Sequence, residues 1–207
     1  MRTGGNDKEI TWNKRFMRKI TFDIETKNTF REVGSREAVD LDLSLVAIHD
    51  SETDEYLSFL EDDLDELWPI IESADSLIGY NSDHFDIPLL DKYYPGDLTK
   101  LKSVDLMKEI QDQLGRRLKL DDVAEATLGE SKSGHGLQAI TWWKEGEIEK
   151  IRKYCIQDVK VTKGVYDYAK EHGHITYPEN GDTRKVPLDT DDWEKPDGSS
   201  MTHSMGF

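Results

Sequence analysis

Alternating apolar and polar residues predict a group of strands in the first sixty residues. Ile20, Phe22 and Ile24 alternate with polar residues, which is the period of a strand with one buried face. The same alternation recurs over 41–48 and, in shorter form, over 55–60. Acidic and Gly/Ser stretches between these runs are typical of turns. The pattern predicts an antiparallel meander of three strands.

After the meander, helical spacing alternates with short apolar runs. Leu64, Leu67, Ile70 and Ile71 repeat at steps of three and four, and Pro88 suits the first turn of a helix. Helices are expected at 64–71, 88–94, 106–114 and 120–128, and short strands at 76–80 and 103–105. A meander of three strands, followed by strands that alternate with helices, is typical of one layered α/β domain.

The clearest periodicity predicts a long helix over 147–171. Its apolar side chains recur on one face at steps of three and four, from Ile148 to Ala169. Gly173 is the expected stop, because glycine adopts the left-handed conformation that ends many helices.

The ends of the chain differ in composition from its middle. The predicted divisions are a polar extension at 1–15, the α/β domain at 16–173, a hairpin at 174–189 and an acidic, Gly/Ser-rich tail at 190–207. The tail is expected to be disordered, because such a composition buries too little apolar surface to offset chain entropy. Residues 130–136 are expected to form a flexible, mildly basic loop.

Charge and cysteine content narrow the class of protein. The chain has 43 acidic and 27 basic side chains, a formal charge of −16, which argues against a protein that coats nucleic acid through phosphate contacts. The negative charge is still compatible with an enzyme that holds a short strand and recruits metal cations.

Cys155 is the only cysteine, so no intrachain disulfide forms and a reducing compartment is expected. No run approaches the roughly 20 apolar residues of a membrane span, nor is there a secretion signal. A cytoplasmic protein is expected.

Two acidic residues share one face of the first predicted strand. Asp23 and Glu25 are two positions apart, so their side chains point the same way. Like charges this close favour a bound cation. The alternative is the exposed face of an edge strand.

Two further carboxylates stand where a charge is expensive. Asp158 falls inside the apolar stripe of the long helix, where an unsatisfied polar group costs about 1–3 kcal/mol or more. Tyr154 lies one turn before it, so a tyrosine–aspartate hydrogen bond is one alternative. Asp86 precedes Pro88, where an ordinary helix cap is the alternative and Asp83 is a competitor for that cap.

Together these segments resemble a known family. Asp-x-Glu on a first strand, Asn81 with Phe85 and Asp86 before a helix, and Tyr-x-x-x-Asp on a late helix are similar to the 3′–5′ exonucleases of the DEDD superfamily. The tyrosine resembles the DEDDy branch; the sister branch has a histidine where this chain has Lys153. Residues 118–129, followed by Lys132, resemble the proofreading domain of family B DNA polymerases and its stand-alone bacterial relatives. The resemblance covers roughly 16–173.

The resemblance implies a fold, a cofactor and a substrate. The fold is α/β and ribonuclease H-like, with a mixed central sheet, an antiparallel meander plus parallel strands, flanked by helices. Two Mg²⁺ ions, replaceable by Mn²⁺, would be held by four carboxylates: Asp23, Glu25, Asp86 and Asp158. Tyr154 would orient the attacking water, since a phenol with a pKa near 10 is a poor base at neutral pH. The substrate would be the 3′ end of single-stranded DNA or RNA, DNA being favoured.

Several residues are candidates for contacting that strand. Thr26, Asn81, Phe85 and Lys132 are candidates for contacting the terminal nucleotide, with an ordinary core position as the alternative for Phe85. Basic side chains offer further candidates, with solvated loop charges as the alternative: Arg116, Arg117, Lys119, Lys132 and His135. Trp142 and Trp143 could stack on bases, although core packing is favoured for at least one. Cys155 is expected to be a small buried residue.

Three other functions stay open at this point. A catalytically silent ribonuclease H-like module could bind nucleic acid or a protein. An exonuclease acting on RNA would share the same site, because recognition of the 2′-hydroxyl is a local detail. Metal-dependent cleavage inside a strand is the third.

Overall fold

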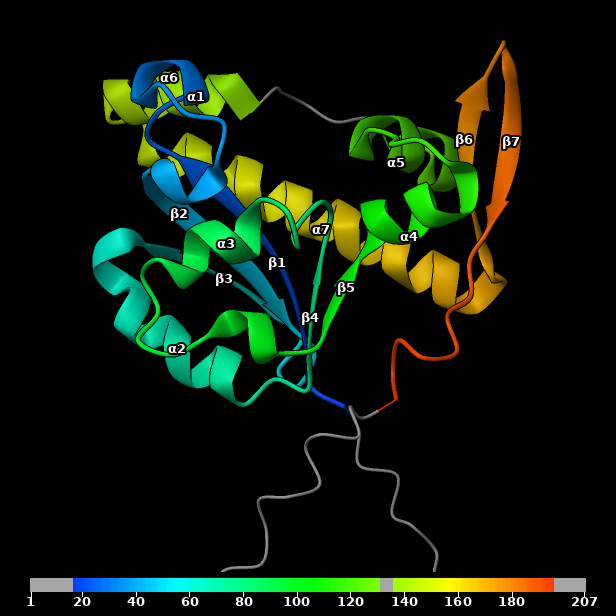
Figure 1. The fold of residues 1–207 in the computed structure, drawn as a ribbon, viewed down its shortest axis with the longest axis horizontal. Coiled ribbons are helices and arrows are strands. Elements are labelled where there is room, and N and C mark those ends of the chain that lie inside the picture. The colour runs from blue at the N-terminus through cyan, green and yellow to red at the C-terminus, as the bar shows by residue number, and fades with distance from the viewer. Residues whose placement is uncertain (1–16, 131–135, 196–207) are drawn as a thin grey trace, which may run out of the picture.

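The structure is a computed structural model that describes residues 17–130 and 136–195. A five-stranded sheet forms its centre, in the order β3-β2-β1-β4-β5 (Figure 1). The strands are β1 (Lys19–Thr26), β2 (Leu43–Asp50), β3 (Glu55–Leu60), β4 (Ser76–Gly79) and β5 (Ser103–Asp105). β1 pairs antiparallel with β2 and parallel with β4. The prediction of a mixed α/β sheet, a meander plus parallel strands, is confirmed.

Helices cover both faces of this sheet. They are α1 (Phe30–Val33), α2 (Leu64–Glu72), α3 (Asp86–Asp91), α4 (Leu106–Leu114), α5 (Leu120–Leu128), α6 (Gly136–Glu145) and α7 (Ile148–His172). Single 3-10 turns lie at Ala38–Asp40, Glu61–Asp63 and Leu98–Lys100. Within residues 17–130 and 136–195, no helix combines the length and apolar character needed to span a membrane.

The alternation along β1 divides the core into two layers. Phe22 and Ile24 pack with Leu67 of α2 and Leu90 of α3 on one face. On the other face, α7 runs across β1 and β2 (Figure 1) and packs its apolar stripe against the sheet. Asp23 and Glu25 alternate with the first set of residues, so they belong to the face that α7 covers.

Most elements lie where periodicity predicts them. The predicted limits of β3, β5 and α5 are those of the structure. Gly173 ends α7 with a φ of 69°, the left-handed conformation that glycine adopts without strain. Helix α6 was not predicted. Its Thr141, Trp142 and Trp143 have modest helix propensity, and packing on α7 stabilises the helix instead.

The C-terminal hairpin packs against the domain. It consists of β6 (His174–Glu179) and β7 (Asp182–Pro187) and lies beside α5 and α7 (Figure 1). The predicted hairpin is therefore present. The predicted extension at 1–15, residues 131–135 of the predicted loop at 130–136 and residues 196–207 of the predicted tail at 190–207 lie outside the described residues. Gly136 begins α6 and is not part of a loop.

The expectation of disorder from residue 190 onward is wrong for 190–195. Trp193 is only 4 % exposed, and its ring stacks on that of Tyr166 with centroids 5.3 Å apart. The Lys102 ammonium donates to the carbonyl of Lys195 (2.6 Å), and Lys19 pairs with Glu194 (2.6 Å). Both ends of the described chain therefore lie side by side (Figure 1). Trp193 alone buries enough apolar surface to hold this segment, although the composition of the segment is mostly polar and acidic.

Trp193→Ala should lower the free energy of unfolding by about 3 kcal/mol, on the scale of buried aromatic truncations. Urea denaturation followed by far-UV circular dichroism measures this. Trp193→Phe keeps a ring against Tyr166 and serves as the control, with a smaller loss. A loss below about 0.5 kcal/mol, the usual effect of a surface substitution, would mean that 190–195 is not packed in solution.

Candidate functional site

A cavity of about 450 Å³ lies at the carboxyl end of β1. All five residues predicted to be catalytic line it: Asp23, Glu25, Asp86, Tyr154 and Asp158. So do three of the four predicted substrate contacts: Thr26, Asn81 and Phe85. Lys132 and His135 lie outside the described residues. Three separate segments of the sequence therefore meet at one cavity, as their carboxylates suggested.

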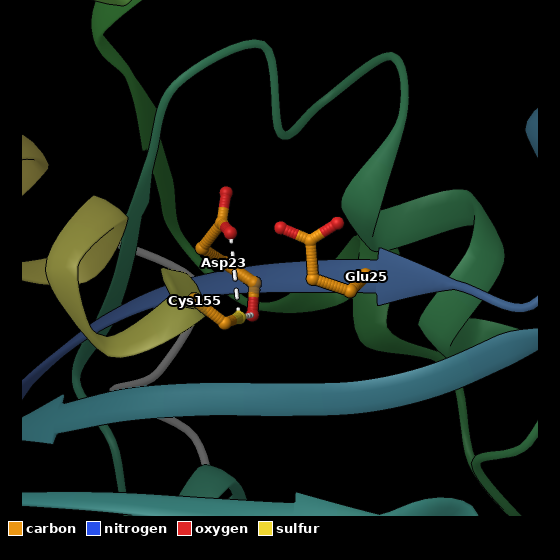
Figure 2. A group of neighbouring side chains, drawn as sticks. All are labelled: Asp23, Glu25 and Cys155. Carbon is orange, nitrogen blue, oxygen red and sulfur yellow. Dashed lines mark hydrogen bonds between the residues drawn. The ribbon is translucent and has the colours of Figure 1, made fainter. Parts of the chain in front are cut away.

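The central strand supplies the first two carboxylates. β1 has neighbours on both sides, so the alternative of an exposed edge strand is wrong. Asp23 stands opposite Ala47 and Glu25 opposite Leu45 in the register with β2. Figure 2 shows both carboxylates projecting from the same side of β1. Two acidic groups are thus held a short distance apart on a rigid support.

Cys155 lies against this pair from α7. Its thiol is fully buried and within hydrogen-bonding distance of the Asp23 carbonyl (3.3 Å) and Oδ2 (3.4 Å), as Figure 2 shows. Burial raises the pKa of this thiol, and the negative charges of Asp23, Glu25 and Asp158 raise it further. The expected small buried residue is therefore also a weak hydrogen-bond donor to Asp23.

Asp86 enters the cavity from the first turn of α3. β4 pairs with β1 only as far as Thr21, and beyond it the Ile24 N–H donates to Asp86 Oδ1 (3.2 Å). Burial, with a smaller contribution from the Asp105 charge, raises the pKa of Asp86 to about 7 against the lowering effect of this hydrogen bond. Among the residues that the structure describes, no side chain caps α3, so the alternative cap roles of Asp86 and Asp83 are wrong. A nearby cation would favour the charged form of this buried group.

Helix α7 supplies the fourth carboxylate and the tyrosine. Asp158 is buried beside Val159 and one turn after Tyr154, as the apolar stripe predicted. The Tyr154 ring meets Trp142 of α6 edge-on, with centroids 6.0 Å apart. Trp142 and Trp143 are partly buried against this layer of the core, which agrees with core packing for these residues.

A hydrogen-bonded turn positions Asn81. Asp105 holds this turn, and the sequence analysis did not single out that residue. Asp105 Oδ1 accepts from the Asn81 N–H (2.7 Å) and the Met107 N–H (3.0 Å), while Oδ2 accepts from the Asp83 N–H (3.1 Å). Asn81 has a φ of 66°, a conformation that needs such support. A side chain at Gly79 would come within 2.4 Å of Ser82, so the turn is tight. An aspartate directly before a predicted helix was the available signal.

The rim of the cavity is apolar, which was also missed. Phe30 of α1 is 38 % exposed and Leu137 of α6 is 71 % exposed. Phe30 meets Phe85 edge-on at 6.0 Å, and an ion pair between Lys144 and Glu32 joins α6 to α1. The capping-box spacing from Thr29 to Glu32 was the sequence signal for α1.

The donor set fits a hard divalent cation. One ligand atom from each of Asp23, Glu25 and Cys155 lies within 4.8 Å of the others in the described part of the chain. The remaining acidic groups of the cavity, Asp86 and Asp158, are carboxylates like those of Asp23 and Glu25, and carboxylate oxygens are the ligands that Mg²⁺ and Mn²⁺ prefer. The Cys155 thiol, whose pKa is raised by burial, is not a ligand of this kind. Burial is the main cause of the raised pKa values of Asp86 and Cys155, and neighbouring carboxylates add to it; a cation would favour the charged form of Asp86.

Comparison with known proteins identifies the family and the fold of this chain. A family model described as the RNase H superfamily matches residues 20–170. A family B DNA polymerase from the hyperthermophilic archaeon Pyrobaculum calidifontis is structurally similar, with a TM-score of 0.56 and 20 % identity, which shows the fold. That match covers 74 % of this chain and 24 % of the polymerase chain, so this chain spans about a quarter of it. No curated protein sequence matches. Because the family match extends over most of its length, the chain belongs to the RNase H superfamily.

Proposed function

We propose that the protein is a metal-dependent 3′–5′ exonuclease of the DEDDy type that acts on single-stranded nucleic acid, with DNA favoured over RNA. The observation that carries the proposal is the convergence of four carboxylates and Tyr154 on one cavity. Membership of the RNase H superfamily supports nuclease activity in general terms, and a bound nucleic acid strand is the corresponding partner.

The four carboxylates are proposed to hold two Mg²⁺ ions, with Mn²⁺ as a substitute. Asp23 and Glu25 face the cavity from β1, Asp86 from α3 and Asp158 from α7. When bound, two such ions supply Lewis acidity, which activates water and stabilises the charge on the phosphate and on the leaving 3′ oxygen. The rigid strand and helix keep the carboxylates in place, so little reorganisation accompanies the reaction.

The size of the cavity favours a strand end over a duplex. About 450 Å³ falls within the roughly 300–1,000 Å³ of small-ligand sites, which is room for a terminal nucleotide. Thr26, Asn81 and Phe85 are proposed to contact it, and the apolar rim suits the face of a base. A site of this size is a poor fit for the middle of a long strand.

Tyr154→Phe should retain measurable cleavage, at about 1–10 % of the wild-type rate. The phenol is proposed to orient the water by a hydrogen bond, and positioning by one group contributes less than the charge of a metal ligand. Single-turnover rates on a 5′-labelled single strand measure this. Tyr168→Phe, on the same helix but outside the cavity, is the control. Complete loss in Tyr154→Phe would assign proton transfer to the hydroxyl.

Incubation with 5′-labelled single-stranded DNA, matching RNA and a circular single strand, in Mg²⁺, Mn²⁺ or EDTA, tests the proposed function. A metal-dependent ladder that shortens from the 3′ end, with an intact circle, is the expected result. A cleaved circle would instead indicate cleavage inside strands, and faster loss of the RNA would reassign the substrate. Binding without cleavage under every condition would favour a silent binding module.

A further inference from the structure

A second cavity, of about 420 Å³, adjoins the first. Tyr80 and Asn81 line both, so the two share a wall at the end of β4. We propose that this second cavity binds backbone phosphates of the strand on the 5′ side of the nucleotide being removed. The proposal rests on the proposed function, because it assumes that a strand end occupies the first cavity.

The shared wall is built to hold its shape. The Tyr80 hydroxyl donates to the Leu118 carbonyl (3.1 Å), which ties the segment before α5 to the end of β4. On the other side, Asp105 accepts the Asn81 N–H. A strand that leaves the first cavity past Asn81 therefore meets a preformed wall, and the ordering cost is confined to the exposed side chains that contact the strand.

Two cations face the second cavity. Arg117 and Lys119 line it and are exposed. The Arg117 Nε donates to Gln111 Oε1 (3.2 Å), an uncharged partner, and among the described residues neither cation is in an ion pair with a carboxylate. The neighbouring Arg116 differs, since it is paired with Glu179 at 3.0 Å.

The balance of charge favours an anionic ligand here. The chain has a net charge of −16, so most of its surface repels phosphates. Asp121 also lines this cavity, and the two cations outnumber it. Arginine and lysine are the side chains that bind phosphate oxygens, by charge and by N–H donation. Met107, Leu118 and Leu120 supply the apolar part of the lining, against which sugars can pack. The second cavity thus combines cations with apolar walls, as single-strand grooves do.

The test compares substrates that do and do not reach the second cavity. Arg117→Gln/Lys119→Gln is assayed on a dinucleotide and on a single strand of about 15 nucleotides, long enough to fill such a groove. On the long strand, KM should rise about tenfold at low salt, and the slope of log KM against log salt should fall by about 1.4, or 0.7 for each lost contact. On the dinucleotide, which has only the scissile phosphate, kcat/KM should stay unchanged.

The control is Lys100→Gln/Lys185→Gln, which removes the same charge from positions that line neither cavity. Equal KM values for the variant, the control and the wild type on the long strand would overturn the proposal, as would an equal loss on the dinucleotide. If the wild type cleaves nothing, the proposed function fails by itself. Fluorescence anisotropy with the long strand then tests whether the second cavity binds the strand. Weaker binding by the variant than by the control supports the proposal, and equal binding overturns it.

Discussion

Asp23→Ala should abolish metal-dependent cleavage, with a loss of about 1,000-fold or more, or roughly 4 kcal/mol of transition-state stabilisation. Asp23 stands on the central strand beside Glu25 and lines the same cavity as Asp86 and Asp158. Removing it leaves the other carboxylates unable to hold both ions. The fold should persist, because the substitution removes negative charge from an acidic cluster that Cys155 and α7 still cover. Single-turnover kinetics and thermal melting of the same preparation measure both effects.

Asp62→Ala is the matched control for this prediction. Asp62 is exposed and lines neither of the two cavities, so its removal should change neither rate nor stability. The increase in Tm that Mn²⁺ produces in the wild type should persist in Asp62→Ala and disappear in Asp23→Ala. Cleavage at the wild-type rate by Asp23→Ala would show that the acidic cavity is not the metal site.

Asp105→Ala should destabilise the protein by about 3 kcal/mol and also slow cleavage. The substitution removes the N-cap of α4, worth about 1 kcal/mol, and leaves the N–H groups of Asn81 and Asp83 without their acceptor, at about 1 kcal/mol or more each. The turn that directs Asn81 into the cavity then loosens. Urea denaturation measures the first effect and KM for a single strand the second.

Two variants separate these effects of Asp105. Asp105→Asn keeps one acceptor oxygen and should recover part of the stability. Asp97→Ala removes the cap of a 3-10 turn at Leu98–Lys100. It should leave KM unchanged, because neither Asp97 nor the turn lines either cavity. An Asp105→Ala protein with wild-type stability would contradict the importance of these hydrogen bonds.

Much of the fold follows from local signals in the sequence. The strands and the long helix are predictable because their apolar residues follow the periods of 2 and 3.6 that burial imposes. Asp158 could be singled out for the same reason, since a carboxylate within an apolar stripe conflicts with its surroundings. Asp23 and Glu25 needed only the alternation of one strand to be placed on one face.

The features that were missed depend on contacts between distant segments. Trp193 is buried against Tyr166, and no local pattern in an acidic segment indicates that partner. Asp105 holds a turn more than twenty residues earlier in the chain, a contact that appears only once β4 and β5 lie side by side. Phe30 and Leu137 form a rim because the ion pair between Lys144 and Glu32 joins α6 to α1 beside the cavity. Such positions are set by tertiary packing and not by propensity.

Anomalous diffraction from crystals grown with Mn²⁺ would show whether the acidic cavity holds two divalent ions, as we propose. We expect two manganese peaks about 3.5–4 Å apart, ligated by oxygens of Asp23, Glu25, Asp86 and Asp158 at the carboxyl end of β1. Both peaks should be absent or reduced to one in Asp23→Ala. No manganese peak in this cavity of the wild-type protein, at millimolar Mn²⁺, would contradict the claim.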